Sequence, residues 1–381
     1  MPDKVTIAVD AMGGDHAPGV VLEGCADALA ADPSLHVVLC GPASVVVPFA
    51  EAHERCTPQP AEEVIGMGEH PARAVRQKRD SSIVAGCRAV REGAAQGFFS
   101  AGSTGACLAA ATLVMGRVKG VARPALATVI PSPVRPVVLT DIGANADCKP
   151  AYLVQFAQMA TVYMEKVLGV ANPRVALLNI GEEDTKGSAF AQEAHALMRE
   201  KVPNFAGNGE GCDILPAAFD VFVTDGFTGN VCLKTIEGTS KTLFKALKGV
   251  LTAGPATKLA ALAVKGGLKG LMERVSPDTY GGAPLLGVKG ACVVGHGSSG
   301  PLAVKNGILT TARIVRERVA ETIEQAVAGA QDADGADAER GGAVAAGVPQ
   351  VGAAGAPAGA DDAATPQAAP DADAPDAGAE R

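Results

Sequence analysis

The sequence contains no tryptophan, and aromatic side chains make up only 3% of its 381 residues. Proteins bind single-stranded nucleic acids largely by stacking bases on aromatic rings, so this scarcity argues against such a ligand. A basic tail that could follow duplex DNA is also missing. No apolar run reaches roughly 18 residues, so the sequence predicts no helix that spans a membrane.

Cysteine is present, but never in a spacing that would make it structural. The nine cysteines are odd in number, scattered and never arranged as CxxC, which argues against disulfides and a zinc site. We expect them to be small buried side chains in a reducing compartment. The chain opens on the strand-like KVTIAVD rather than on a signal peptide, so we expect a cytoplasmic protein.

The formal net charge of −8 comes from the end of the chain. Residues 331–381 hold ten acidic and two basic residues, which leaves 31 of each sign in the rest. This segment consists almost wholly of Ala, Gly, Pro, Asp and Gln, and we predict a disordered tail. Residues 1–330 are then the folded α/β domain.

Short apolar runs that end in Gly or Asp alternate with helical patterns. This alternation predicts a mainly parallel, doubly wound sheet with helices on both faces. Ligands bind such sheets at the carboxyl ends of the strands. The eight predicted strands are 5–9, 37–40, 98–101, 126–130, 137–139, 175–180, 221–223 and 292–294.

A lysine-rich segment departs from this pattern. Between Thr239 and Met272 there are six lysines, no arginine and no acidic residue. Apolar residues follow helical spacing, and Gly254-Pro255 interrupts them, which predicts a projecting amphipathic hairpin over 239–275. A packing helix with solvated lysines and a membrane-surface helix both fit. Three lysines share one predicted face: Lys241, Lys245 and Lys248.

The first strand leads into DAMGGDHAP, residues 10–18. Gly13 and Gly14 let the backbone approach a ligand, and the following helix start can bind an anion. His16 is a candidate donor there. In the alternative interpretation Asp15 caps the helix and His16 only fills the turn.

The segment SAGSTGA, residues 100–106, has the same strand, turn and helix form. The hydroxyl groups of Ser103 and Thr104 and the backbone amides could hold phosphate oxygens. A tight turn that requires small residues is the alternative. A nucleophilic role for Ser103 is poorly supported because the sequence is not GxSxG.

Two loops resemble each other, TDIGAN at 140–145 and TDGFTGN at 224–230. Asp141 and Asp225 could be paired carboxylates for acid/base chemistry or a metal, or turn residues that bond their own backbone. No His, Cys or Glu set with metal spacing accompanies them, so we expect no metal.

The segment NIGEEDTKG, residues 179–187, ends a predicted strand with an acidic run and one lysine. Lys186 at a strand end suits contact with a phosphate. The alternative is a solvated salt bridge to Glu182 or Glu183.

The segment GHGSSG, residues 295–300, matches GxGxxG. One long helix to about residue 328 is predicted to follow, so no later strand supplies the acid that would bind a ribose. We therefore interpret the segment as an anion-binding helix start with His296 as a possible donor.

A basic cluster formed by Arg73, Arg76, Lys78 and Arg79 precedes another helix. It is either a solvated face or a docking surface for an acidic partner.

Together, the motifs resemble the PlsX family of phosphate acyltransferases, in order from Val5 to Arg318. Ser103 departs from the asparagine of that family's SAGNTGA. The matching segments are DAMGGDHAP, SAGSTGA, TDIGANAD, LNIGEEDTKG, GNGEGCDI, VTDGFTGNVCLKTIEG, YGGAPLLGVKG and GHGSS.

The resemblance implies an acyltransferase of lipid metabolism. Such an enzyme transfers a long fatty acyl group from acyl carrier protein to inorganic phosphate. The acyl phosphate then serves a downstream glycerol-3-phosphate acyltransferase in phospholipid biosynthesis. The resemblance also implies a fold similar to phosphotransacetylase and the isocitrate and isopropylmalate dehydrogenases, a homodimer, and peripheral association with the cytoplasmic membrane.

Attack of phosphate on a thioester needs no cofactor, only a held dianion and a stabilised oxyanion. We expect Lys186 and Asn230 to be the central catalytic pair, with His16 third as donor or proton shuttle. The anionic membrane surface or the acidic carrier protein would dock on Lys241, Lys245 and Lys248 or on Arg76 and Arg79. Further phosphate or thioester contacts are expected at Gly13, Gly14, Ser103, Thr104, Asn145, Asp225 and His296.

Three other functions are weighed against this one. A short-chain phosphotransacetylase acting on a coenzyme A thioester shares the phosphate chemistry. A catalytically silent membrane scaffold would keep the hairpin, but retention of Lys186, Asn230 and the Gly-rich loops argues against it. A nicotinamide-dependent dehydrogenase is weakest because the GxGxxG segment lacks its context.

Overall fold

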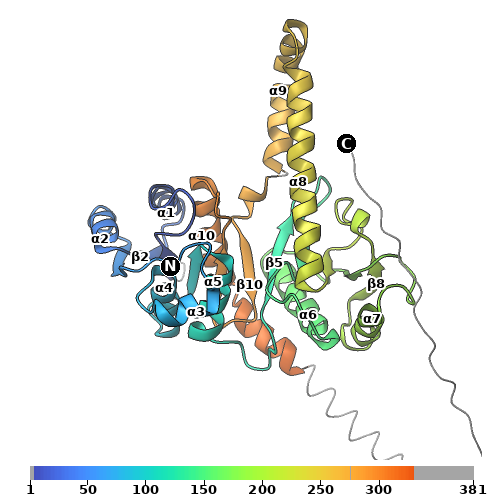
Figure 1. The fold of residues 1–381 in the computed structure, drawn as a ribbon, viewed down its shortest axis with the longest axis horizontal. Helices are drawn as coiled ribbons and strands as arrows, with labels where there is room; N and C mark the ends of the chain where they lie inside the picture. The colour runs from blue at the N-terminus through green and yellow to red at the C-terminus, as the bar shows by residue number, and fades with distance from the viewer. Residues whose placement is uncertain (1–3, 275, 330–381) are drawn as a thin grey trace, which may run out of the picture. The chain divides into compact units, whose positions relative to one another are not determined.

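The computed structural model describes residues 4–274 and 276–329 (Figure 1). In this part of the chain, eleven strands form one sheet in the order β3-β2-β1-β4-β11-β10-β5-β6-β9-β7-β8. The strands are β1 (Val5–Asp10), β2 (Leu35–Gly41), β3 (Cys56–Pro60), β4 (Gly97–Ser100), β5 (Ala125–Ile130), β6 (Val137–Thr140), β7 (Val175–Leu178), β8 (Phe205–Gly209), β9 (Val221–Val223), β10 (Ala283–Leu286) and β11 (Ala291–Val294).

The expectation of a mainly parallel sheet is confirmed. Seven strand pairings are parallel and three are antiparallel. The antiparallel pairings are β11 with β10, β10 with β5, and β5 with β6. Strands β3, β2, β1, β4 and β11 therefore form one parallel block, and β6, β9, β7 and β8 form a second. Because three reversals separate them, the two blocks run in opposite directions.

All eight predicted strands are present, and β3, β8 and β10 are additional. Strands β3 and β8 lie at the two edges of the sheet, where proline and glycine are tolerated. Their sequences, CTPQP and FAGNG, contain those residues and lack an apolar run, which is why the pattern missed them.

Helices cover both faces of the sheet. They are α1 (Gly19–Ala31), α2 (Ala43–Glu51), α3 (Pro71–Gln77), α4 (Ser82–Arg91), α5 (Thr104–Ala110), α6 (Pro150–Lys166), α7 (Ala189–Lys201), α8 (Gly226–Leu251), α9 (Pro255–Arg274) and α10 (Pro301–Arg316). Alternate residues of a strand enter different cores: Phe99 of β4 packs with α1 and α10, and Phe98 packs with α4 and α5. The sheet is therefore doubly wound.

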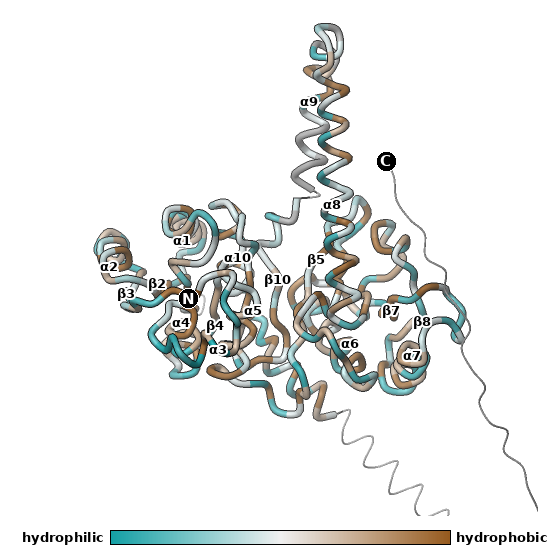
Figure 2. The backbone as a smooth tube through the Cα atoms, in the orientation of Figure 1, coloured by the Kyte–Doolittle hydropathy of each residue, from teal (hydrophilic) through white to brown (hydrophobic). Residues whose placement is uncertain are grey.

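The lysine-rich segment forms the hairpin that its pattern predicts. Helices α8 and α9 run side by side and are separated at Thr252–Gly254 (Figure 1). Apolar and polar residues alternate along α8 (Figure 2), and Leu243 and Val250 are each 66% exposed. Helix α8 begins at Gly226, well before the predicted hairpin start at 239, so a single helix joins a site loop to the hairpin. Among the described helices, none combines the length and the hydropathy that a membrane span requires.

The last helix differs from its prediction as one continuous element. Helix α10 ends at Arg316, Arg318 takes a positive φ of 53°, and helical structure resumes over residues 319–329. This interruption redirects the chain so that Val319, Ile323 and Val327 are buried in the core. The predicted tail, 331–381, lies outside the described residues.

Candidate active site

The loops that follow β1, β4 and β11 meet at one edge of the sheet. We call residues 11–18, 101–104 and 295–300 the first cradle. The backbone N–H of Asp15 donates to the carbonyl of Gly297 at 2.7 Å. A Cβ on Gly13 would lie 2.7 Å from the nitrogen of Gly102, so only glycine allows these two loops to approach so closely.

A buried polar pair, Asp10 at the end of β1 and Ser100 at the end of β4, holds the first cradle in place. The hydroxyl group of Ser100 donates to Asp10 Oδ2 at 2.7 Å and accepts from the N–H of Gly102 at 3.0 Å. Asp10 Oδ1 also accepts from the N–H of Met12 at 3.0 Å. Burial raises the pKa of Asp10, and hydrogen bonds oppose that shift. Our sequence analysis missed this pair, although an aspartate and a serine at the ends of neighbouring strands were its signal.

One of the side chains predicted to bind a ligand in the first cradle is instead hydrogen-bonded within the protein. Ser103 is the N-cap of α5, and its hydroxyl group accepts from the N–H of Ala106 at 3.4 Å. Thr104 begins that helix and is exposed, as is His16. Pro18 is the N-cap of α1 and makes no side-chain cap, so the alternative in which Asp15 caps this helix is wrong.

His296 lies exposed on the third loop of the cradle. Its Nδ1 is 3.2 Å from the backbone N of Ser298, a group that can only donate. Nδ1 therefore accepts, and in the neutral ring Nε2 carries the proton. This tautomer makes His296 a hydrogen-bond donor toward a ligand.

The loops after β6, β9 and β7 form a second group at the carboxyl edge of the other block. We call residues 141–149, 179–188 and 224–230 the second cradle. Asp141 is fully buried at its centre. Its carboxylate accepts five N–H bonds, from the backbones of Leu126, Gly143, Ala144 and Asn145 and from the Asn145 side chain, at 2.7–3.1 Å. Burial raises its pKa although these bonds oppose the shift. Asp141 thus organises the loop.

The Asn145 side chain is also engaged in this scaffold. Its Nδ2 donates to Asp141 Oδ2 at 2.9 Å and to the Pro124 carbonyl at 2.8 Å, which uses both hydrogens of the amide. The Asn145 carbonyl accepts from the N–H of Gly226 at 2.8 Å and so ties the β6 loop to α8. Asn145 therefore donates to the protein rather than toward a ligand in this structure.

Asp225 and Asn230 lie on the first turns of α8. Asp225 is the N-cap, accepting from the N–H of Thr228 at 2.9 Å and from its hydroxyl group at 2.7 Å. This matches the turn interpretation of Asp225. Asn230 is exposed, and its Nδ2 donates to the Ile142 carbonyl at 3.0 Å. One further N–H of that amide remains for a ligand.

Lys186 lies in the loop between β7 and α7. Its Nζ is 3.8 Å from Glu183 Oε1, and the side chain is 47% exposed. The predicted salt bridge is thus present but long and solvated, a geometry that contributes little stability. The backbone is better fixed, because the Lys186 N–H donates to the Glu183 carbonyl at 3.0 Å and its own carbonyl accepts from Asn179 Nδ2 at 3.1 Å.

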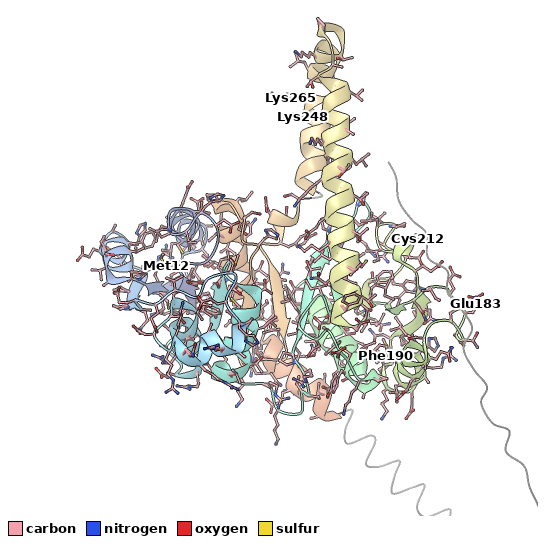
Figure 3. All side chains as sticks on the ribbon, in the orientation of Figure 1. Met12, Glu183, Phe190, Cys212, Lys248 and Lys265 are labelled. Carbon is pink, nitrogen blue, oxygen red and sulfur yellow. The ribbon has the colours of Figure 1, made fainter. Side chains whose placement is uncertain are left out.

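The structure places the predicted residues in two groups. Lys186 and Asn230 follow the neighbouring strands β7 and β9 and share the second cradle. His16, Ser103, Thr104 and His296 belong to the first. No hydrogen bond or ion pair found among the described residues joins the two groups. In Figure 3, Met12 of the first cradle and Glu183 of the second lie in different halves of the drawing.

The basic cluster borders the first cradle. Helix α3 packs against α5, and a Cβ on Gly105 would lie 2.5 Å from the Pro71 ring. Arg73, Arg76 and Arg79 are exposed on or just after α3. Nearby, Met67 is 54% exposed, and a Cβ on Gly297 would lie 2.6 Å from its methyl group. A cationic and an apolar surface thus adjoin this cradle.

No group of three or more His, Cys, Asp or Glu side chains suited to a metal ion occurs in the described part of the chain.

Solved structures with a similar fold include a phosphotransacetylase from Streptococcus pyogenes and a branched-chain phosphotransacylase from Enterococcus faecalis. The first has a TM-score of 0.52 and 17% identity, over 81% of this chain and 94% of that one. The second has a TM-score of 0.51 and 15% identity, over 82% and 99%. At such identities the likeness concerns the fold alone, and it confirms the expected phosphotransacetylase-like fold.

Sequence relatives are much closer. Phosphate acyltransferases from Desulfitobacterium hafniense (strain Y51), Heliobacterium modesticaldum and Bacillus licheniformis are 46%, 45% and 44% identical. The alignments cover 84%, 85% and 84% of this chain and 96%, 98% and 98% of the relatives. The sequence model of a family described as fatty acid synthesis protein matches residues 5–322. The chain therefore belongs to this family, the PlsX family of phosphate acyltransferases.

Proposed function

We propose that this acyltransferase takes its fatty acyl group from the thioester of acyl carrier protein and passes it to inorganic phosphate. A phosphate oxygen forms a bond to the thioester carbonyl carbon, the C–S bond breaks, and the phosphate proton passes to the departing sulfur. The products are acyl phosphate and the free carrier thiol. The observation that carries this proposal is that Lys186 and Asn230 share one sheet edge in a chain of this family.

In this reaction Lys186 holds the phosphate dianion, and Asn230 donates to the phosphate or to the thioester oxygen. The partly exposed ammonium group of Lys186 suits an incoming anion. The remaining N–H of Asn230 provides the kind of fixed donor that stabilises a developing oxyanion. Asn230→Ala should lower turnover by roughly a hundredfold.

His16 is the third residue in this proposal, as donor or proton shuttle, and His296 offers a second donor in the same cradle. Both lie apart from Lys186 in the structure. In this proposal the first cradle binds part of the acyl-bearing arm of the carrier protein. His16→Ala should then affect the KM for the carrier substrate more than the KM for phosphate.

The acidic carrier protein docks on the basic cluster that includes Arg76 and Arg79. Helix α3 adjoins the first cradle, so a carrier bound there can deliver its arm over a short path. Opposite charge mainly speeds such an encounter, so binding should weaken with salt. Lys241, Lys245 and Lys248 on the hairpin then face an anionic membrane surface, where the acyl phosphate passes to a glycerol-3-phosphate acyltransferase. We also propose a homodimer that is cytoplasmic and peripherally membrane-associated.

The first experiment incubates purified protein with palmitoyl-acyl carrier protein and phosphate in the presence of EDTA. Release of free carrier thiol and acyl phosphate, dependent on phosphate, would support the proposal. Activity with acetyl-coenzyme A instead would favour a short-chain phosphotransacetylase, the candidate to which the similar solved fold draws attention. No reaction with either thioester would favour a catalytically silent membrane scaffold.

A further inference from the structure

The loop that carries Lys186 is held by a buried side chain outside both cradles. His195 of α7 is 3% exposed and packs edge-on against the ring of Phe205, with centroids 5.1 Å apart. Its Nδ1 lies 2.9 Å from Oδ1 of Asn208, which is also 3% exposed, on β8. A buried imidazole paired with a buried amide is a costly arrangement unless both are satisfied.

The bonding direction follows from a single carbonyl group. Asn208 Nδ2 donates at 2.8 Å to the backbone carbonyl of Glu183, which can only accept. The Asn208 oxygen therefore faces His195, and Nδ1 of the imidazole carries the proton and donates. The same Glu183 carbonyl also accepts from the N–H of Lys186 at 3.0 Å. Only one peptide carbonyl separates the buried pair from the backbone of the lysine.

The other side of the imidazole faces the same loop. His195 Nε2 lies 3.2 Å from Asp184 Oδ1, a contact that is an ion pair only when the imidazole carries a second proton and that lacks the alignment of a hydrogen bond. Arg199, one turn further along α7, donates to Asp184 Oδ2 at 2.5 Å. The Arg199 guanidinium, with a smaller contribution from His195, holds the pKa of Asp184 below its ordinary value. Asp184 thus stays a carboxylate anchored to α7.

We infer that His195 is a positioning residue for acyl transfer, acting through Asn208 and Asp184 to fix the Glu183–Lys186 turn and thereby the ammonium group of Lys186. This inference rests on the proposed phosphate-binding role of Lys186. Within the described part of the chain, the ammonium group of Lys186 makes no hydrogen bond and one ion pair, at 3.8 Å to Glu183 of the same turn. The position of the ammonium group therefore depends on how this backbone turn is held.

Two disruptive substitutions and one conservative variant test the connection without removing Lys186. Asn208→Asp keeps the acceptor for His195 but sets a carboxylate oxygen against the Glu183 carbonyl, so that bond is lost. His195→Leu removes both contacts, whereas His195→Asn restores a donor near the position of Nδ1. We expect Asn208→Asp and His195→Leu to raise the KM for phosphate about tenfold, in line with loss of one buried hydrogen bond. The kcat and the KM for the acyl carrier substrate should change much less, and His195→Asn should recover most of the phosphate affinity.

A matched control is His53→Leu. His53 is a half-buried histidine just after α2 whose Nδ1 lies 2.8 Å from the Phe49 carbonyl, in the other parallel block. Its loss should lower the melting temperature without changing the KM for phosphate. If His53→Leu raises that KM as much as His195→Leu does, the effect is general destabilisation and the inference is overturned.

Lys186→Ala separates this inference from the proposed function. If Asn208→Asp acts through Lys186, adding it to Lys186→Ala should raise the KM for phosphate no further, whereas independent effects would multiply. A raised KM in Lys186→Ala with an unchanged KM in Asn208→Asp would overturn the inference and leave the proposed function standing. An unchanged KM in Lys186→Ala would overturn both.

Discussion

Asp10 and Asp141 occupy corresponding places in the two parallel blocks, at the carboxyl ends of β1 and β6. Both are buried, and both hold the following loop through hydrogen bonds to its backbone. A charge buried in this way is costly unless such bonds satisfy it. Asp141, an acid/base candidate in the sequence, and Asp10, which the sequence analysis did not single out, therefore hold the loops that carry the exposed candidate residues.

Asp10 makes folding stability depend on pH. Burial raises its pKa above the ordinary value of 3.8, so the folded state favours the neutral carboxyl. Its contribution to stability is fully present below pH 3.8 and is lost as the pH rises through the raised value. Asp10→Asn never ionises, so the melting temperature of this variant minus that of the wild type should become more positive from pH 4 to pH 7.

Thermal unfolding across that range measures this difference. The exposed Asp27→Asn, on α1, removes the same charge and should give a flat difference. A flat line for Asp10→Asn as well would mean that burial does not shift its titration.

At the scale of elements, α8 couples the second cradle to the hairpin, because one helix begins at the Asp225 cap and continues to Leu251. Its first turns pack tightly, whereas its middle is open. A Cβ on Gly229 would lie 1.9 Å from the Asp141 carbonyl oxygen, but a Cβ on Gly238 would meet nothing within 4 Å. Identical substitutions on this helix should therefore have opposite effects.

We expect Gly229→Ala to destabilise the protein by about 1–3 kcal/mol, because the added methyl group forces the β6 loop away. Gly238→Ala should stabilise it by roughly 0.5–1 kcal/mol, since alanine is the better helix former in an open position. Denaturant unfolding of the two variants compares them directly. Equal effects of the same sign would contradict the tight packing at Asp141.

The hairpin lysines make a separate prediction. Changing Lys241, Lys245 and Lys248 to Glu should abolish binding to vesicles that contain anionic phospholipid, because each basic residue near such a surface contributes about 1 kcal/mol. Vesicle flotation measures the binding, and wild type on purely zwitterionic vesicles is the control. Unchanged binding of the triple variant would exclude these lysines as the membrane contact and leave them as solvated residues of a packing helix.

At the scale of the whole molecule, the reactivity of the cysteines measures how completely the described part of the chain is packed. Six of the nine are buried, Cys148 and Cys232 are half-buried, and Cys212 is exposed. Burial raises the pKa of Cys56 to about 11 and that of Cys107 to about 12. Since the thiolate is the reactive form, buried thiols should be slow on two grounds.

A thiol titration of the native protein at pH 8 should therefore show one fast-reacting thiol, and Cys212→Ser should remove it. In denaturant, all nine thiols of the wild-type chain should react. Fast reaction of several thiols in the native Cys212→Ser variant would show that the body opens more readily than this packing implies.

Most of the strands, the hairpin and the family could be predicted from local patterns in the sequence. Continuous apolar runs such as Val137–Leu139 predicted strands, the lysine and leucine spacing predicted the hairpin, and the ordered motifs predicted the family. These features depend on residues that are neighbours in sequence, and local propensity and periodicity encode them. The proline and glycine in β3 and β8 hid those strands, because an edge position tolerates what an interior strand does not.

Local pattern predicted that Gly-rich loops follow the strands, and it singled out Lys186, Asn230 and His16. Which of these loops share an edge of the sheet depends on the tertiary fold. The pairing of Leu285 with Leu126, far apart in the chain, places the antiparallel pair β10 and β5 between the blocks and so reverses one block against the other. It separates His16 from Lys186. Other contacts between distant parts of the chain bury the supporting residues, Asp141 beside Leu126 and His195 beside Phe205 and Asn208. Strand pairing over such distances depends on packing of the whole core, which no local pattern records.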